Sequence, residues 1–197
     1  MGSIRALLAL SVVFAHSYGF VFVGGQRAVQ IFYIISGFLI SLILYEGVKY
    51  KSRLKFYMNR GLRLFPGYFV VLFLTFFLLI FWDEFATQSG ILNVYDSIDG
   101  FGEAALLLSN VTLFGQDWMM FTGYKDGVFQ FVKGFDDSDV PLQKGFLVPQ
   151  AWTLGVEISF YLIAPFIVKN RPLIILLLVC SLILRLVFVV DGIGRQD

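Results

Sequence analysis

The first apolar segment holds two ionisable residues, Arg5 and His16, whose spacing could support transfer chemistry. They stand eleven positions apart, close to three full helical turns, so one helix face would carry both, about 16 Å apart along the axis. A lone imidazole changes charge near neutral pH and can act as a general base or a nucleophile. His16 is the only histidine, which excludes a multi-histidine metal site. A helix-packing histidine with an arginine reaching to the membrane edge is the alternative interpretation.

Two further arginines, Arg60 and Arg63, stand just before a Leu-Phe-Pro sequence. Their i, i+3 spacing predicts that both guanidinium groups share one helix face, a geometry suited to clamping phosphates. Basic residues also flank membrane spans in general and bind lipid head groups. The spacing alone therefore leaves an anion site and a lipid anchor equally open.

One acid, Glu157, and one small pair, Ser36-Gly37, also lie inside apolar segments. A carboxylate in such a segment needs a cation, hydrogen bonds or a proton, and Arg185 in the last segment is a candidate partner for Glu157. A structural ion pair and a catalytic role both fit Glu157. The Ser36-Gly37 pair indicates close helix packing first and a site lining second.

The chain around these residues is too apolar for a water-facing surface. It has 197 residues, of which 58% are hydrophobic and 15% charged, a net charge of +1 and a mean hydropathy of +0.79. Soluble domains are about 45–50% apolar and about 25% charged. High apolar content and a single cysteine exclude disorder, collagen and a disulfide scaffold, and the near-neutral charge gives no support for nucleic-acid binding. The composition predicts an integral membrane protein.

A membrane span needs about 17–25 mostly apolar residues, and five segments meet or approach this length. They are residues 4–23, 28–45, 67–82, 151–168 and 173–190. The segment 104–114 is shorter and is predicted to be interfacial or re-entrant. We therefore expect an all-α polytopic bundle of about five transmembrane helices. A cleaved signal peptide over residues 1–19 is the alternative for the first span, although no A-x-A-like site follows it.

The charges of the connecting segments predict the orientation of the bundle. Between the second and third spans, six basic residues stand against one acid, so this loop should be cytoplasmic. Residues 83–150 contain ten acids and three lysines and should form an ordered extracytoplasmic loop. If 104–114 does not cross, the fourth span delivers Lys169 and Arg171 to the cytoplasm. This reading predicts five crossings with a cytoplasmic N-terminus.

Four separated motifs together resemble the acyltransferase 3 family of membrane acyltransferases. They are Arg5-x10-His16, the run Val29–Ile40 around Ser36-Gly37, the segment Arg60–Pro66, and Trp152–Glu157 followed by Phe160-Tyr161 and Pro165. Two positions depart mildly from the family pattern: Gln30 stands where an acid is usual, and Thr153 where a serine is usual.

The resemblance implies transfer of an acyl group, often acetyl, from a coenzyme A thioester to a hydroxyl of a sugar or other envelope molecule. It implies one domain over residues 1–197, as the N-terminal part of a fold of roughly ten helices in a bacterial inner membrane. A transporter or flippase-like protein, or an inactive truncated subunit, are the alternatives. The expected partners are acyl-CoA, a carbohydrate or other envelope hydroxyl, and the lipid bilayer.

On this basis each candidate residue receives an expected role. His16 and Glu157 are expected to be catalytic, with His16 as a general base or as an acyl carrier. Arg5, Arg60 and Arg63 are expected to bind acyl-CoA at the cytoplasmic face. Ser36 and Trp152 are expected to line the site. We expect no metal and no permanently bound cofactor, because acyl-CoA is the donor substrate.

Overall fold

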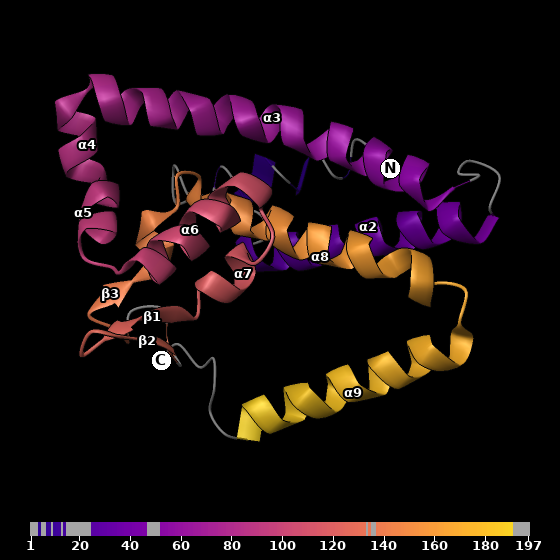
Figure 1. Cartoon of the computed structure of the whole chain (residues 1–197). Helices are drawn as coiled ribbons and strands as arrows, with labels where there is room; N and C mark the ends of the chain where they lie inside the picture. Colours follow the sequence, from indigo (N-terminus) through magenta and orange to yellow (C-terminus); the bar gives the residue numbers. More distant parts are fainter. Residues whose placement is uncertain are drawn as a thin grey trace.

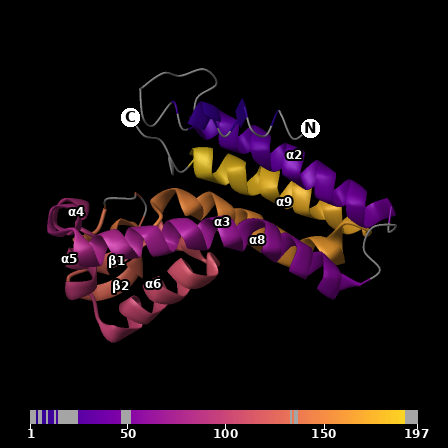
Figure 2. The same cartoon turned by 90° about the horizontal axis from the view of Figure 1, so that it is seen from above.

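The computed structural model consists of a bundle of long helices and a compact cap at one end of it (Figure 1). It describes residues 4, 7–8, 10–12, 14, 25–46, 52–132, 134 and 137–190. The long helices are α2 (Gly25–Glu46), α3 (Arg53–Phe81), α8 (Trp152–Ile167) and α9 (Arg171–Val190). Seen from above, α3 runs over α8, and the cap gathers at one end of this pair (Figure 2).

Three stretches of helix in the described residues are long and apolar enough to cross a membrane: Arg27–Tyr45, Arg53–Phe81 and Pro149–Ile167. The prediction of a helical integral membrane protein agrees with them. The first predicted span, 4–23, falls mostly outside the described residues, and the fifth corresponds to helix α9. Five crossings therefore remain a prediction.

Helix α3 begins earlier than the sequence indicated. The side chain of Ser52 caps it by accepting a hydrogen bond from the backbone N–H of Lys55, at 3.3 Å. The helix then continues through Pro66, whose missing N–H removes one backbone hydrogen bond. Arg60 and Arg63 are consequently part of a membrane helix and do not lie in the loop between two spans.

Helices α2 and α8 run side by side in the same direction. Near one end, the Tyr33 hydroxyl donates a hydrogen bond to the carbonyl oxygen of Thr153, at 3.0 Å. Two turns further along α2, the buried Ile40 belongs to one core cluster with Tyr161 and Ala164 of α8. Ser36 lies between Tyr33 and Ile40 and is therefore near the level of Glu157.

Helix α3 packs on α8 in the opposite direction. The Tyr57 hydroxyl donates to the carbonyl oxygen of Leu162, at 3.0 Å, and the buried Tyr68 clusters with Ala151. Arg60 lies between these two levels. The antiparallel register therefore brings Arg60 close to the level of Glu157.

The cap is formed by residues 83–150 and has its own core. Its elements are α4 (Asp83–Ser89), α5 (Ile91–Asp96), α6 (Gly100–Thr112), α7 (Gln116–Met119), β1 (Thr122–Lys125), β2 (Val128–Phe131), β3 (Val140–Pro141) and two 3₁₀ turns, Leu142–Gly145 and Pro149–Ala151. Its core consists of Val94, Leu106, Tyr124, Leu142 and Phe146. An ordered cap over this segment was predicted.

An all-α fold was predicted, and the cap corrects this. Strands β1, β2 and β3 form an antiparallel sheet in the order β2-β1-β3. Asp126 and Gly127 join β1 to β2 with positive φ values of 52° and 74°. An Asp-Gly pair at such a two-residue turn is a strong hairpin signal, but strands of two to four residues leave little alternation to detect.

Helix α6 contains most of the segment 104–114, whose crossing was left open. Its 13 residues span about 20 Å, less than the ~30 Å hydrocarbon core, so α6 does not cross. Its end is anchored in protein, because Tyr68 of α3 donates a hydrogen bond to the carbonyl oxygen of Asn110. The Asn110 side chain in turn accepts from the Leu147 backbone N–H, at 3.0 Å.

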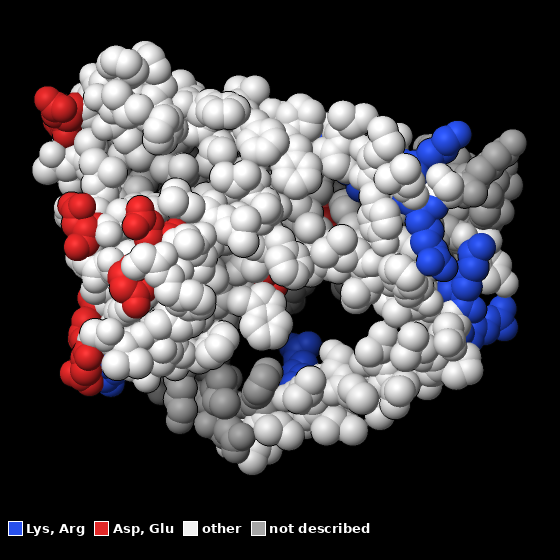
Figure 3. All heavy atoms as spheres, viewed as in Figure 1, with Lys and Arg blue, Asp and Glu red and all other residues white. Residues whose placement is uncertain are grey.

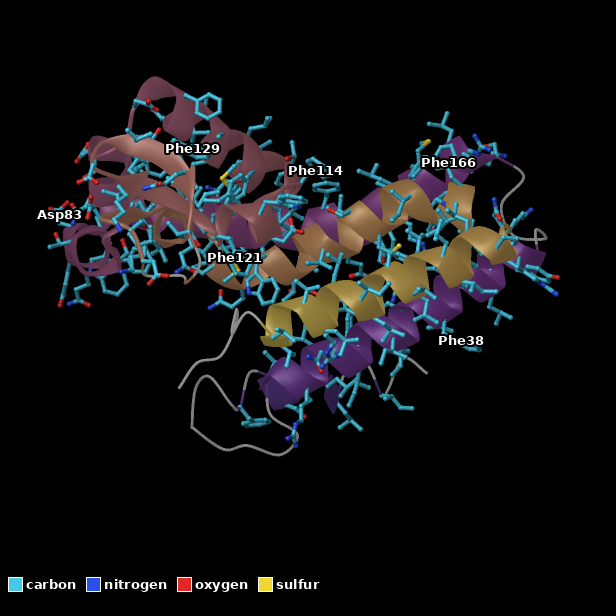
Figure 4. All side chains as sticks on the ribbon, turned by 90° about the horizontal axis from the view of Figure 1, so that it is seen from below. Phe38, Asp83, Phe114, Phe121, Phe129 and Phe166 are labelled. Carbon is cyan, nitrogen blue, oxygen red and sulfur yellow. The ribbon has the colours of Figure 1, made fainter. Side chains whose placement is uncertain are left out.

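The charges separate along the molecule. Acidic side chains gather over the cap, and most basic side chains in this view lie at the opposite end, where α3 begins and α8 ends (Figure 3). Asp83 and Phe166 mark these two ends (Figure 4). The guanidinium carbon of Arg53 lies 4.5 Å from the Phe166 ring centroid, and Arg171 donates to the Tyr45 hydroxyl at 3.4 Å. The basic first residues of α3 and α9 therefore lie beside the ends of α8 and α2.

Candidate active site

A buried cation and a buried carboxylate contact the same tyrosine inside the bundle. Arg60 of α3 is only 6% exposed, and its guanidinium carbon lies 5.6 Å from the ring centroid of Tyr161 on α8. Glu157, also on α8, is 3% exposed, and its Oε1 accepts a hydrogen bond from the Tyr161 hydroxyl. We refer to Arg60, Tyr161 and Glu157 as the buried polar cluster.

Local helix geometry explains how α8 contributes two members of this cluster. Glu157 and Tyr161 are four residues apart, so their side chains are neighbours on one helix face. That face is a buried one, because Ala164 on the same side of α8 is buried with them. Gly155 is buried on the other side of α8, where it faces the cap.

The cluster places charge where solvation is weakest. A buried charge is costly unless it is paired or hydrogen-bonded, and the Tyr161 hydroxyl and ring provide such contacts for Glu157 and Arg60. Phe56 adds a second aromatic ring, with its centroid also 5.6 Å from the Arg60 guanidinium carbon. The Nε of Arg60 is buried and makes no hydrogen bond within the described part of the chain. This donor is available to an anionic ligand.

The expected lining residues lie on α2 and at the start of α8. Ser36 is 3% exposed, and its Oγ has no hydrogen-bond partner in the described residues. Trp152 is half-buried at the first position of α8. Ser36 therefore offers a second buried polar atom near the level of Glu157.

Asp117 is a candidate that sequence reasoning missed. It lies half-buried on α7, where burial raises the pKa of its carboxyl above the usual value, and its Oδ1 has no hydrogen-bond partner among the described residues. Gly155 lets α7 approach α8, since a Cβ there would lie 2.7 Å from the Leu113 carbonyl oxygen. Both Asp117 and Glu157 are close enough to Tyr33 to influence it electrostatically. No signal in the sequence separates Asp117 from the other acids of the cap.

Of the remaining predicted residues, Arg5 and His16 lie outside the described residues. Both arginines lie on α3, three positions apart as their spacing predicted, but Arg63 is exposed whereas Arg60 is buried. Arg185 is exposed on α9. In the described ranges, no three His, Cys, Asp or Glu side chains gather to hold a metal ion.

A cleft of about 580 Å³ lies between α3 and the cap, away from the basic end. Its lining includes Thr75 of α3, Phe85 and Ser89 of α4, and Gln143 and Gln150. The rest of the lining is mainly apolar and includes Val71, Ile91 and Leu147, so the cleft combines an apolar wall with a few amide and hydroxyl groups. The cleft adjoins the start of α8, where Trp152 follows Gln150 by two residues.

A family model described as an acyltransferase domain, that of acyltransferase 3, matches residues 2–194. No curated protein matches the chain, and no solved structure matches it. The family match covers almost every residue, including Arg60, Glu157 and the apolar helices that hold them. The chain therefore belongs to the acyltransferase 3 family of membrane acyltransferases.

Proposed function

We propose that this protein transfers an acyl group, most simply acetyl, from acyl-CoA at the cytoplasmic face to a hydroxyl of a sugar or other envelope molecule. Membership of the family supports acyl transfer by a membrane protein as the general activity. The observation that carries the finer proposal is the buried polar cluster, a cation and a carboxylate held together within membrane helices. It lies on α3 and α8, which have basic side chains at one end and the acidic cap at the other.

The basic end is the donor side in this proposal. Coenzyme A carries several phosphates, and the exposed Arg53 and Lys55 of α3 supply positive charge there. Arg60 lies seven residues from the start of α3, about 10 Å deeper, with a buried Nε that can donate to an anion. Arg63 lies about one turn beyond Arg60, so Arg60 and Arg63 would bind acyl-CoA at successive depths, with Arg5 expected nearby.

Glu157 and His16 carry the chemistry in this proposal. As a general base, His16 takes the proton of the acceptor hydroxyl while its oxygen attacks the thioester carbonyl, and coenzyme A leaves as a thiolate that is then protonated. As an acyl carrier, His16 attacks the thioester first, releases coenzyme A and then passes the acyl group to the hydroxyl. Glu157, fixed by Tyr161, orients either His16 or the acceptor.

The acceptor approaches from the cap side. The cleft between α3 and the cap supports this direction, since it is lined by Gln143, Gln150 and Phe85 and opens next to α8. Asp117 adds a polar side chain on the cap side, where Gly155 allows α7 to lie directly on α8. Donor and acceptor would therefore reach the buried polar cluster from opposite ends.

Labelled acetyl-CoA supplied to membranes that contain the protein tests this proposal. Wild-type protein should pass label to a glycan-bearing fraction, and His16→Ala should not, while both reach the membrane in equal amount. Equal labelling by both would remove His16 from the mechanism. Movement of the acceptor without consumption of acetyl-CoA would indicate a transporter and overturn the proposed function.

A further inference from the structure

Tyr161 contacts both charges of the buried polar cluster through different parts of its side chain. Its hydroxyl donates a hydrogen bond to Glu157 Oε1, and its ring lies 5.6 Å from the Arg60 guanidinium carbon. The side chain is 5% exposed, and Phe56 packs edge-on against its ring, with centroids 6.2 Å apart. Its position is therefore fixed by packing on two helices.

We propose that Tyr161 is a positioning residue that sets the geometry of the acid and of the donor-binding arginine together. This inference rests on the proposed function, in which Glu157 acts in the chemistry and Arg60 binds acyl-CoA. The hydroxyl limits the orientations of the Glu157 carboxylate, and the ring face holds the guanidinium group above α8. Tyr161 need not touch either substrate.

The two contacts can be separated by substitution. Tyr161→Phe keeps the ring beside Arg60 and removes only the hydroxyl that bonds Glu157. Tyr161→Leu removes both the hydroxyl and the ring. A residue that only filled space would affect the two kinetic constants together, whereas the two roles proposed here affect different constants.

Tyr57 provides a matched control on the neighbouring helix. It also packs against Phe56, with ring centroids 5.5 Å apart, but its hydroxyl joins α3 to α8, whereas the Tyr161 hydroxyl bonds Glu157 within α8. That hydroxyl bonds the Leu162 backbone carbonyl, on the exposed side of the helix pair. Tyr57→Phe therefore removes an interhelical hydrogen bond without removing the contact to Glu157.

The test measures acetyl transfer at varied acetyl-CoA concentration for wild type, Tyr161→Phe, Tyr161→Leu and Tyr57→Phe in membranes. Tyr161→Phe should lower kcat by about tenfold or more and leave the KM for acetyl-CoA unchanged, since one hydrogen bond to a charged group is lost. Tyr161→Leu should lower kcat and also raise that KM severalfold. Tyr57→Phe should match wild type in both constants.

Three contrary results would each count against a different part of the proposal. A Tyr161→Phe variant with the kcat of Tyr57→Phe overturns the positioning role of the hydroxyl. A Tyr161→Leu variant whose KM equals that of Tyr161→Phe overturns the role of the ring. Absence of transfer by the wild-type protein counts against the proposed function itself. Because Tyr161→Phe is nearly isosteric, it keeps the test decisive even if the leucine variant fails to fold.

Discussion

At the scale of single residues, two arginines that lie only three positions apart on α3 differ in their exposure to solvent. Arg60 is buried against Phe56 and Tyr161, whereas Arg63, one turn away, is exposed. Exposed ion contacts are screened by water and salt, and buried ones much less so. The two residues should therefore contribute unequally to the binding of acyl-CoA.

Substitution of each arginine tests this difference. Arg60→Ala should weaken acetyl-CoA binding by about tenfold or more, because a charge-assisted contact in a buried site is lost. Arg63→Ala should weaken it by only a few fold. Equilibrium binding of labelled acetyl-CoA to purified protein measures both, with Arg60→Lys as the variant that keeps the charge. Unchanged affinity in Arg60→Ala would leave Arg60 with a packing role alone.

At the scale of elements, Gly155 decides how closely the cap approaches the bundle. A Cβ at this position would lie 2.7 Å from the Leu113 carbonyl oxygen, a backbone atom that cannot rotate away. Gly155→Ala should therefore push α7 from α8 and destabilise the fold by about 1–3 kcal/mol. Gly67→Ala is the control, because no neighbouring atom lies within 4 Å of its added Cβ. Thermal unfolding in detergent measures both, and equal midpoints would contradict the close packing.

The start of α6 makes the stability of the cap depend on pH. Asp99 caps this helix by accepting a hydrogen bond from the Gly102 backbone N–H, at 2.9 Å, and a second one from the Tyr124 hydroxyl. These bonds, the Gly102 bond first, hold the pKa of the Asp99 carboxyl below its usual value. The folded pKa is thus below the unfolded pKa, so the stabilisation is complete above the unfolded pKa. It is lost as the pH falls through the folded pKa.

Acid unfolding of the cap tests this linkage. Asp99→Asn should reduce the loss of protection at acidic pH, because asparagine can still cap the helix but does not titrate there. Asp96→Asn, at an exposed position of α5, serves as the control. Hydrogen exchange of the α6 amides at several pH values measures the effect. Identical pH dependence in wild type and Asp99→Asn would contradict it.

The sequence indicates most elements but not how the site is assembled from them. Long apolar runs predict α2, α8 and α9, and turn residues predict an ordered cap. The start of α3 is hidden because Pro66 and the basic residues before it are typical of a loop, although apolar neighbours keep the helix continuous. Tyr161 can be placed beside Glu157 from i, i+4 spacing, but its contact with Arg60 depends on the packing of α3 on α8. Asp117 reaches the site only through tertiary packing of the cap.

At the scale of the whole molecule, charge separation predicts which end faces which side of the membrane. Basic residues gather where α3 begins and α8 ends, and acids gather over the cap (Figure 3). In membrane proteins, the loops and helix ends on the cytoplasmic side carry an excess of Lys and Arg. In a Cys180→Ala background, Lys55→Cys should therefore react with a membrane-impermeant thiol reagent only after the membrane is opened. Asp126→Cys should react in intact cells, and labelling of both from the same side would contradict the orientation.

The buried polar cluster is proposed as the acyl-transfer site. Substitution of its carboxylate, Glu157, is the most direct test of that role. Glu157→Gln keeps the size of the side chain and removes its charge, while Glu103→Gln makes the same change at an exposed position of the cap. The rate of label transfer from acetyl-CoA is measured for both variants at equal amounts in the membrane. We expect a loss of about 100-fold or more for Glu157→Gln and an unchanged rate for Glu103→Gln. Transfer by Glu157→Gln at the wild-type rate would contradict it.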